Sequence, residues 1–184
     1  MSENNNLKTE TIILGGGCFW CTEAVFVRVR GVLDVESGYC NGQPDRPSYE
    51  QVCSGETGCV EVVRLDFDPA VIPLEQILAI FFAIHDPTQL DRQGHDLGTQ
   101  YRSGVYCTDD WQQAVVRDFI SGLEREQVFS RPVVTEVQPL RHYWPAEDYH
   151  QDFFERNPNQ GYCLAVAAPK VAKLRAAFAG WLRD

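Results

Sequence analysis

The segment TIILGGGCFWCTEAVF, residues 11–26, places two cysteines three residues apart, directly after an apolar run and three glycines. Cys18 and Cys21 can form a redox pair, supply half of a metal site, or be one reactive thiol and a bystander. A strand followed by a glycine turn predicts Cys18 at a helix start, where unpaired N–H groups and the helix dipole favour a thiolate. A helix end lowers a thiol pKa by about one unit, so we expect the substrate to complete the activation.

Other interpretations of this segment are weaker. A buried structural cysteine is common, but a glycine triplet is a poor wall for a packed core. A phosphate-binding loop would need the Lys-Ser/Thr ending that GGGCFW lacks. A zinc module would need a second Cys-x-x-Cys or a His-x₃₋₅-His pair, and the sequence has neither. We therefore expect a reactive thiol with no metal and no cofactor.

A second candidate lies in the strand-like segment CVEVVRLDFDP, residues 59–69. Its alternation places Glu61 on the same face as Cys59, Val63, Leu65 and Phe67. A glutamate on such a face either extends to solvent, as is usual, or is a desolvated carboxyl whose raised pKa lets it donate a proton near neutral pH. The pattern alone leaves both open.

Composition limits the class of protein. The chain has 184 residues, 44% of them hydrophobic and 23% charged, which indicates one globular domain. Its net charge of -10 argues against nucleic-acid binding. The polar start MSENNNLKTE lacks the features of a signal peptide, and no apolar run is long enough for a membrane span. Seven cysteines, an odd number, argue against a disulfide framework and favour a cytoplasmic location.

The elements that must position these residues follow from periodicity and turn signals. We expect a flexible N-terminal tail over residues 1–10 and a single catalytic domain over residues 11–184, acting as a monomer. Strands are predicted at residues 12–14, 32–39, 59–69, 103–107 and 132–137, and helices at residues 18–28, 73–82, 109–123, 146–157 and 169–182. The order predicts an α+β fold: a ferredoxin-like α/β sandwich with a β-α-β-β-α-β core and a C-terminal helical extension.

Four segments closely resemble the A-type peptide methionine sulfoxide reductase family. They are GGGCFWCTEAVF, PSYEQVCSGETGCVEVVRLDFDP, HDPTQLDRQGHDLGTQYRS and AEDYHQDFFERNPNQGYC, which cover most of residues 14–163 in the family's order. The resemblance implies a ferredoxin-like α/β fold. It also implies reduction of the S epimer of methionine sulfoxide, free or in proteins, with thioredoxin as the partner that supplies reducing equivalents.

The resemblance also implies site residues. Cys18 matches the nucleophile, Glu61 the acid beside the sulfoxide oxygen, and Phe19 and Trp20 the apolar walls that hold the S-methyl group. Three further positions match the polar part of the substrate site: Tyr49, Asp96 and Tyr101. From the residues alone, the tyrosines would be ordinary loop residues and Asp96 a turn-forming Asp.

Two cysteines compete as partner of Cys18. Cys163 matches a recycling cysteine of the family and follows NPNQGY, a segment that we expect to be a loop able to swing over the site. Cys21 lies one helical turn from Cys18. We predict Cys163 as the main resolving thiol and Cys21 as relay or substitute.

The remaining cysteines and histidines receive lesser roles. Cys21, Cys59 and His95 stand where many family members carry glycine, histidine and asparagine. Cys40, Cys53 and Cys107 are expected to be bystanders, and His150 to have a supporting structural role. The alternative function is a thioredoxin-like dithiol–disulfide oxidoreductase using Cys18 and Cys21, which would leave Glu61 idle.

Overall fold

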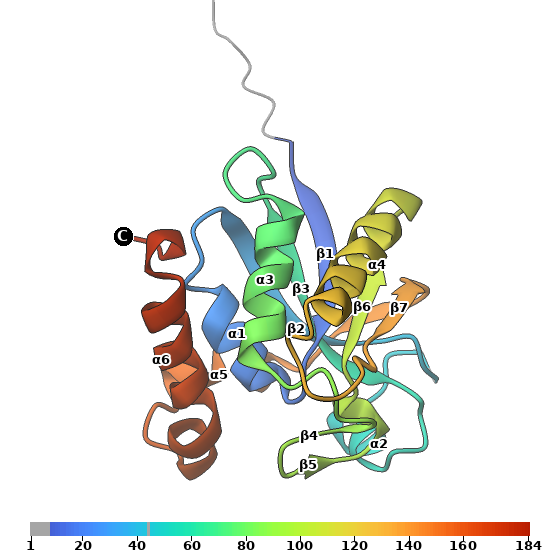
Figure 1. Ribbon diagram of the computed structural model, residues 1–184. Coiled ribbons are helices and arrows are strands. Elements are labelled where there is room, and N and C mark those ends of the chain that lie inside the picture. Colours follow the sequence, from blue (N-terminus) through green and yellow to red (C-terminus); the bar gives the residue numbers. More distant parts are fainter. Residues whose placement is uncertain (1–7, 44) are drawn as a thin grey trace, which may run out of the picture.

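The computed structural model describes residues 8–43 and 45–184 (Figure 1). Most of the predicted tail, residues 1–7, lies outside the described residues. The first strand begins at Glu10, which pairs with Phe67. Within the described part of the chain, no helix has both the length and the apolar character needed to cross a membrane.

A six-stranded sheet forms the centre of the molecule, in the order β7-β6-β1-β3-β2-β8. Neighbouring strands are antiparallel except β6 and β7, which are parallel. Its strands are β1 (Glu10–Gly15), β2 (Val32–Cys40), β3 (Val60–Phe67), β6 (Gly104–Cys107), β7 (Glu136–Pro139) and β8 (Tyr143–Pro145). A separate hairpin consists of β4 (Arg92–Gln93) and β5 (Asp96–Leu97).

The alternation of β3 decides which side chains meet the helices. Val63 and Leu65 join the large core beneath the helices, whereas Val60 and Val62 pack with Ile13 on the opposite face. This confirms the two faces predicted from the sequence. Glu61 follows the first set and is only 1% exposed.

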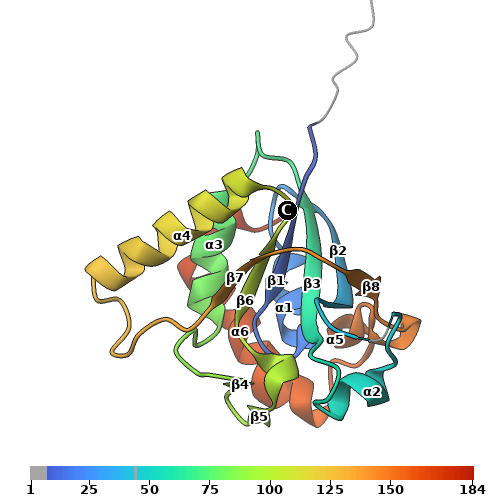
Figure 2. The same ribbon diagram turned by 90° about the vertical axis from the view of Figure 1, so that its right-hand side faces the viewer.

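Four helices cover one face of the sheet (Figures 1 and 2). They are α1 (Phe19–Phe26), α3 (Leu74–Ile84), α4 (Asp110–Arg125) and α6 (Ala168–Ala177). The buried side of α3 includes Ile77 and Phe81, in agreement with the helical periodicity of its sequence. The side chain of Asp109 caps α4 by accepting a hydrogen bond from the N–H of Gln112. The shorter helices are α2 (Tyr49–Cys53) and α5 (Phe153–Arg156).

The sheet is strongly curled, as its connectivity requires. β7 and β8 occupy opposite edges, which in a flat sheet would be about 24 Å apart at 4.8 Å per strand. Four residue steps join Pro139 to Tyr143, and these span at most about 14 Å. The edges must therefore bend toward each other, and this connection crosses the face away from the helices (Figure 2).

Asn41 fixes this crossing connection at the end of β2. Its Nδ2 donates to the carbonyl of Pro139 at 3.1 Å, and its Oδ1 accepts from the N–H groups of Arg141 at 2.9 Å and His142 at 3.3 Å. Its own N–H donates to the carbonyl of His142 at 3.0 Å. One side chain thus holds both edge regions of the curled sheet.

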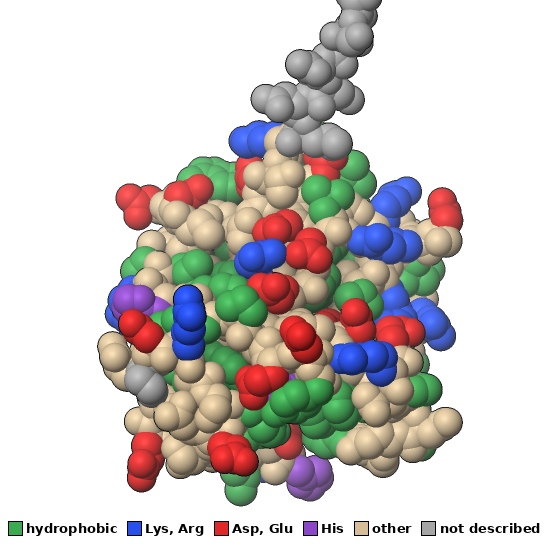
Figure 3. Space-filling model, turned by 180° about the vertical axis from the view of Figure 1, so that it is seen from behind, with side chains coloured by type: hydrophobic (Ala, Val, Ile, Leu, Met, Phe, Trp, Pro, Cys, Tyr) green, Lys and Arg blue, Asp and Glu red, His purple; other side chains and the backbone are tan. Residues whose placement is uncertain are grey.

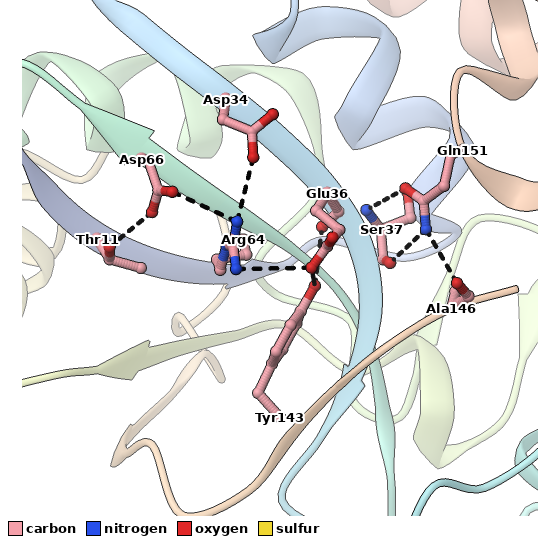
Figure 4. Close-up of polar contacts among 9 residues, drawn as sticks. All are labelled: Thr11, Asp34, Glu36, Ser37, Arg64, Asp66, Tyr143, Ala146 and Gln151. Carbon is pink, nitrogen blue, oxygen red and sulfur yellow. Dashed lines mark hydrogen bonds and ion pairs between the residues drawn. The ribbon is translucent and has the colours of Figure 1, made fainter. Parts of the chain in front are cut away.

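Charged side chains gather on the face opposite the helices (Figure 3). There Arg64 forms ion pairs with Asp34, Glu36 and Asp66 (Figure 4). A separate contact joins β2 to the C-terminal region, because the side chain of Gln151 bonds both the N–H and the carbonyl of Ser37.

Two predicted elements differ in the structure. The strand expected at residues 132–137 lies at residues 136–139, since β6 begins at Gly104 and its partner in β7 is Glu136. The helix expected at residues 146–157 is broken into a 3₁₀ turn, Asp148–His150, and the single-turn helix α5. The break is at Asp152, which has a left-handed φ of 53° and donates its N–H to Glu23.

Candidate active site

Cys18 lies at the N-terminus of α1, as the glycine turn predicted, and is the N-cap residue. Gly17 has φ 93°, which L side chains rarely adopt, and a Cβ there would come within 2.7 Å of the side chain of Gln93. The turn therefore requires glycine, and it brings Gln93 against the start of the helix. Cys18 itself is 9% exposed.

The two thiols of the CxxC segment influence each other's pKa. Burial raises the pKa of Cys18, and a hydrogen bond with Cys21 and the charge of Glu61 raise it further. The same hydrogen bond lowers the pKa of Cys21, with a smaller lowering effect from the charge of Lys170. The pair therefore loses its first proton as a unit. Burial thus moves the pKa of Cys18 upward, opposite to the lowering expected from the helix end alone.

Glu61 is hydrogen-bonded to the start of the same helix, α1. Its Oε1 accepts the N–H of Phe19 at 3.3 Å, and its Oε2 is buried with no hydrogen-bond partner among the described residues. Burial raises the pKa of Glu61 to about 8, with a smaller upward effect from the charge of Asp96. A carboxyl with this pKa is mostly protonated at neutral pH and can act as a proton donor.

Trp20 is half-buried and lies close to Cys18 in the chain, whereas Phe19 belongs to the core. The indole of Trp20 stacks on Phe153 with ring centroids 3.7 Å apart, and its Nε1 donates to Nδ1 of His150 at 3.0 Å. The side chain of Phe19 is fully buried against Tyr39 and His150. Phe19 thus donates its N–H to Glu61, while its ring packs against His150, the residue that accepts the hydrogen bond from Trp20.

His150 is more central than its sequence role suggested. It is fully buried, and its ring packs 4.4 Å from Tyr49 and 5.0 Å from Phe19, measured between centroids. Burial lowers the pKa of His150. A neutral imidazole that accepts at Nδ1 carries its proton on Nε2. The sequence signal that could have indicated this position is a single histidine within AEDYHQDFFERN, a segment rich in aromatic and acidic residues.

The two predicted tyrosines both respond to the charge of Glu61. Tyr49 is the first residue of α2, not a loop residue, and its N–H donates to Glu147 at 3.1 Å. Tyr101 ends a 3₁₀ turn, Thr99–Tyr101. Burial first, and then the charge of Glu61, raises the pKa of each phenol, so both keep their O–H donors.

Asp96 lies in the β4–β5 hairpin and is joined to the thiol pair through Tyr162. The hydroxyl of Tyr162 donates to Oδ2 of Asp96 and lies 3.8 Å from the sulfur of Cys21. A cavity of about 130 Å³ opens here, lined by Cys18, Gln93, Gly94, His95, Asp96, Tyr162, Val166 and Lys170. Tyr162 is not among the residues predicted from the sequence, although it directly precedes Cys163 in a family segment.

Cys163 is not in a loop. It begins a π-helical turn, Cys163–Ala167, that continues directly into α6, and it is fully buried. Its N–H donates to the side chain of Gln160 at 3.0 Å. Burial and, to a smaller extent, the charge of Cys21 raise the pKa of Cys163. The prediction of a loop was wrong because NPNQGY ends in a helix start.

The other candidates differ in burial and in their neighbours, and Tyr49 and Glu61 both act on the pKa of Cys53. Cys40, Cys59 and Cys107 are buried, whereas Cys53 is exposed, and all seven cysteines are free. His95 is exposed at the rim of the cavity. Among the described residues, no group of three or more His, Cys, Asp or Glu side chains could hold a metal ion.

A thiol pair at a helix start beside a protonated carboxyl, on an α+β sheet covered by helices, defines a cysteine-based oxidoreductase. Comparison with known proteins specifies the family. The family model described as peptide methionine sulfoxide reductase matches residues 10–181. The chain therefore belongs to the peptide methionine sulfoxide reductase family.

Individual relatives agree with this assignment. The chain is 50% identical to peptide methionine sulfoxide reductase MsrA of Chromobacterium violaceum over 95% of this chain and 99% of the relative. It is 55% identical to the MsrA of Ralstonia nicotianae, over 92% of this chain and 91% of the relative.

Solved structures share the fold. The reduced form of Mxr1 from Saccharomyces cerevisiae matches with a TM-score of 0.78 at 32% identity, covering 89% of this chain and 95% of that one. Methionine sulfoxide reductase A of Corynebacterium diphtheriae gives a TM-score of 0.75 at 33% identity, covering 83% and 76%. Mxr1 in an unusual oxidised form gives 0.62 at 29% identity, covering 86% and 89%.

Proposed function

We propose that this enzyme reduces the S epimer of methionine sulfoxide, free or in proteins, to methionine. The observation that carries the proposal is the Glu61 carboxyl, buried, partly unpartnered and bonded to the same helix start that positions Cys18. A sulfoxide oxygen needs a proton as a nucleophile attacks its sulfur, and a protonated carboxyl supplies it.

In the first step, the sulfur of Cys18 attacks the sulfoxide sulfur. Glu61 donates a proton to the oxygen, while the hydroxyls of Tyr49 and Tyr101 stabilise its developing charge. Trp20 contacts the S-methyl group of the substrate, and Phe19 packs behind Trp20 through His150. Oxygen transfer releases methionine and leaves a sulfenic acid on Cys18. Two electrons pass from the cysteine to the substrate, and no cofactor takes part.

In the second step, a neighbouring thiol condenses with the sulfenic acid, giving a disulfide and water. Both Cys21 and Cys163 are candidates for the thiol that attacks the Cys18 sulfenic acid. Their placement favours Cys21 as the first to react, whereas the sequence predicted Cys163. Cys21 lies in the first turn of the helix that Cys18 caps, whereas Cys163 is held in a helical turn. Cys21 therefore forms the first disulfide, and Cys163 then attacks Cys21 and frees Cys18.

Thioredoxin is the proposed reductant of the final disulfide. A further structure with this fold, at 22% identity and a TM-score of 0.55, is Mxr1 in complex with Trx2. The alternative, a general dithiol–disulfide oxidoreductase using Cys18 and Cys21, agrees less well with the burial of both thiols. Reduction of insulin disulfides by the purified protein would favour that alternative.

The finer description of fold and setting is also a proposal. The four inner strands, ordered β6-β1-β3-β2, with α1 and α3 on one face, support a ferredoxin-like core, and α6 would be its C-terminal extension. We further propose one catalytic domain over residues 11–184, acting as a monomer in the cytoplasm. Sedimentation of the purified protein tests the monomer.

Incubation with the separated S and R sulfoxides and dithiothreitol tests the activity. We expect reduction of the S epimer only, and none by Cys18→Ser, because a serine hydroxyl is almost never ionised near pH 7. Cys107→Ser, at a buried cysteine away from the site, is the matched control. Reduction of neither epimer by the wild-type enzyme would refute the proposed function.

A further inference from the structure

A second, larger hollow adjoins the catalytic cavity. Its volume is about 520 Å³, and it lies between the end of α3, residues 129–131 and the start of α6. The C-terminal end of α3 and the N-terminal end of α6 lie at the same end of the molecule as the β4–β5 hairpin (Figure 1). Apolar side chains, including Phe82 and Phe129, form part of its lining.

Two side chains separate this hollow from the Cys18 cavity, and they line both. They are Gln93 and Lys170. Gln93 is fixed in place because its Nε2 donates to the carbonyl of Asp86 at 2.9 Å and its Oε1 accepts the N–H of Asp86 at 3.0 Å. It also packs against Gly17 of the catalytic turn. Because the two hollows share these lining residues, a polypeptide bound over Cys18 can extend from one into the other.

The hollow is positively charged in an otherwise acidic protein. Arg131, Lys170 and Lys173 line it, and none of them has an ion-pair partner within 4 Å in the part of the chain that the structure describes. Its one carboxylate, Asp86, already accepts hydrogen bonds from the N–H and the hydroxyl of Thr88. The whole chain has a net charge of -10, so this cluster of unpaired cations is local and attracts negative groups.

We propose that this cationic hollow binds acidic side chains of the polypeptide that carries the oxidised methionine. The inference rests on the proposed function and specifies its substrate class: methionine sulfoxide in acidic stretches of protein. Carboxylates flanking the sulfoxide pair with Arg131 and Lys173, while Lys170 spans the partition beside the thiols. The mixed apolar lining accommodates the polypeptide between its charges.

The test compares peptides that carry one methionine sulfoxide between aspartates, between serines or between lysines, with dithiothreitol as reductant. Arg131→Glu and Lys173→Glu reverse two of the charges, and Lys170 is left unchanged because it acts on Cys21. Arg175→Glu is the matched control, since this residue is exposed on the same helix but does not line the hollow.

We expect the double variant to lower kcat/KM for the aspartate peptide roughly 5-fold or more, a scale set by two exposed charge pairs reversed in sign. The serine peptide should be reduced at the wild-type rate, and the wild-type preference for aspartate over lysine should weaken as salt is raised. Arg175→Glu should behave as wild type.

Three outcomes would overturn the proposal. The first is equal kcat/KM for the three peptides in the wild-type enzyme. The second is an equal loss for all peptides in the double variant. The third is a loss that occurs with thioredoxin but not with dithiothreitol, because the hollow would then dock the reductant. Continued reduction of the serine peptide keeps each of these distinct from failure of the proposed function.

Discussion

Glu61 is the proposed source of the proton that sulfoxide reduction requires, and its burial sets its protonation state. Burial places its pKa at about 8, so that the acid form predominates at neutral pH. As pH rises through that value, the carboxyl loses the proton it must donate. We therefore expect the rate of the first chemical step to fall above pH 8 even though the thiols become easier to ionise.

Replacing Glu61 by Gln should slow this first step by roughly 10²–10⁴-fold, the scale for loss of a positioned general acid. Single-turnover methionine release, measured with substrate in excess of enzyme and no reductant, isolates the step. The amide keeps the shape of the side chain, so the fold should persist. A rate equal to that of wild type would exclude the acid role.

Glu23 is a second buried carboxyl, and it links pH to stability. It accepts the N–H of Asp152 at 3.0 Å, its Oε2 has no partner among the described residues, and burial raises its pKa to about 7. Between about pH 4.5 and 7 the folded protein holds this proton while the unfolded chain has released it. The free energy of unfolding therefore falls as pH rises through that window.

Substituting Glu23 by Gln should flatten this part of the pH–stability profile. The loss of unfolding free energy between about pH 4.5 and pH 7 should become smaller by up to about 3 kcal/mol, and the part of the slope that comes from Glu61 should remain. Urea unfolding at a series of pH values measures the change. The exposed Glu75→Gln variant is the control. A Glu23→Gln profile parallel to that of wild type would show that the carboxyl is ionised in the folded state.

At the scale of elements, the order of disulfide formation depends on where α1 and the π-helical turn hold their cysteines. Cys21 can meet Cys18 within one helical turn, but Cys163 must leave a buried helical position. Adding substrate without reductant to Cys163→Ser should therefore trap a Cys18–Cys21 disulfide at the wild-type rate. Peptide mass mapping identifies the bond.

The reciprocal variant, Cys21→Ser, should close its disulfide more slowly, because the Cys163 turn has to unwind first. A Cys18–Cys163 bond forming in that variant as fast as any disulfide forms in wild type would restore Cys163 as the direct resolving thiol.

Several elements were predictable because their local signals agree with the fold. The alternation of β3 gave the buried side of Glu61, and the glycine turn gave the helix that begins beside Cys18. The rest depends on tertiary contacts that no local pattern contains. Asp152 breaks the expected helix because its N–H bonds a carboxylate on α1, and Cys163 is helical although Asn, Gly and Pro precede it.

The same limit applies to the site. The segments that resemble the family indicated Cys18, Glu61 and the tyrosines. In the structure Glu61 bonds the start of the helix that Cys18 caps, and its charge acts on the tyrosine Tyr101. Tyr162 was missed because its role is the bridge between Asp96 and Cys21, which are distant in sequence. Burial, which reversed the expected direction for the pKa of Cys18, is also a property of the whole fold.

For the whole molecule, the curl of the sheet depends on the clasp formed by Asn41. Replacing Asn41 by Ala leaves the N–H groups of Arg141 and His142 and the carbonyl of Pro139 without their partners. It also places alanine at a left-handed φ of 55°. We expect a loss of roughly 2–4 kcal/mol in the free energy of unfolding.

Chemical denaturation measures the effect of Asn41→Ala. Activity at low temperature should survive, since the clasp lies on the face away from α1. Asn157→Ala, which removes a single hydrogen bond to the carbonyl of Phe153, is a milder amide control. A variant as stable as wild type would mean that the strand pairing alone maintains the curl.

The burial of the thiols has a consequence for how the resting enzyme meets small reactive molecules. Of the seven cysteines, six are buried and only Cys53 is exposed. Alkylating agents bulkier than a methionine side chain therefore reach Cys53 more readily than the buried Cys18 and Cys21. The raised pKa of Cys18 acts in the same direction, because a thiol that is not ionised reacts slowly with such agents.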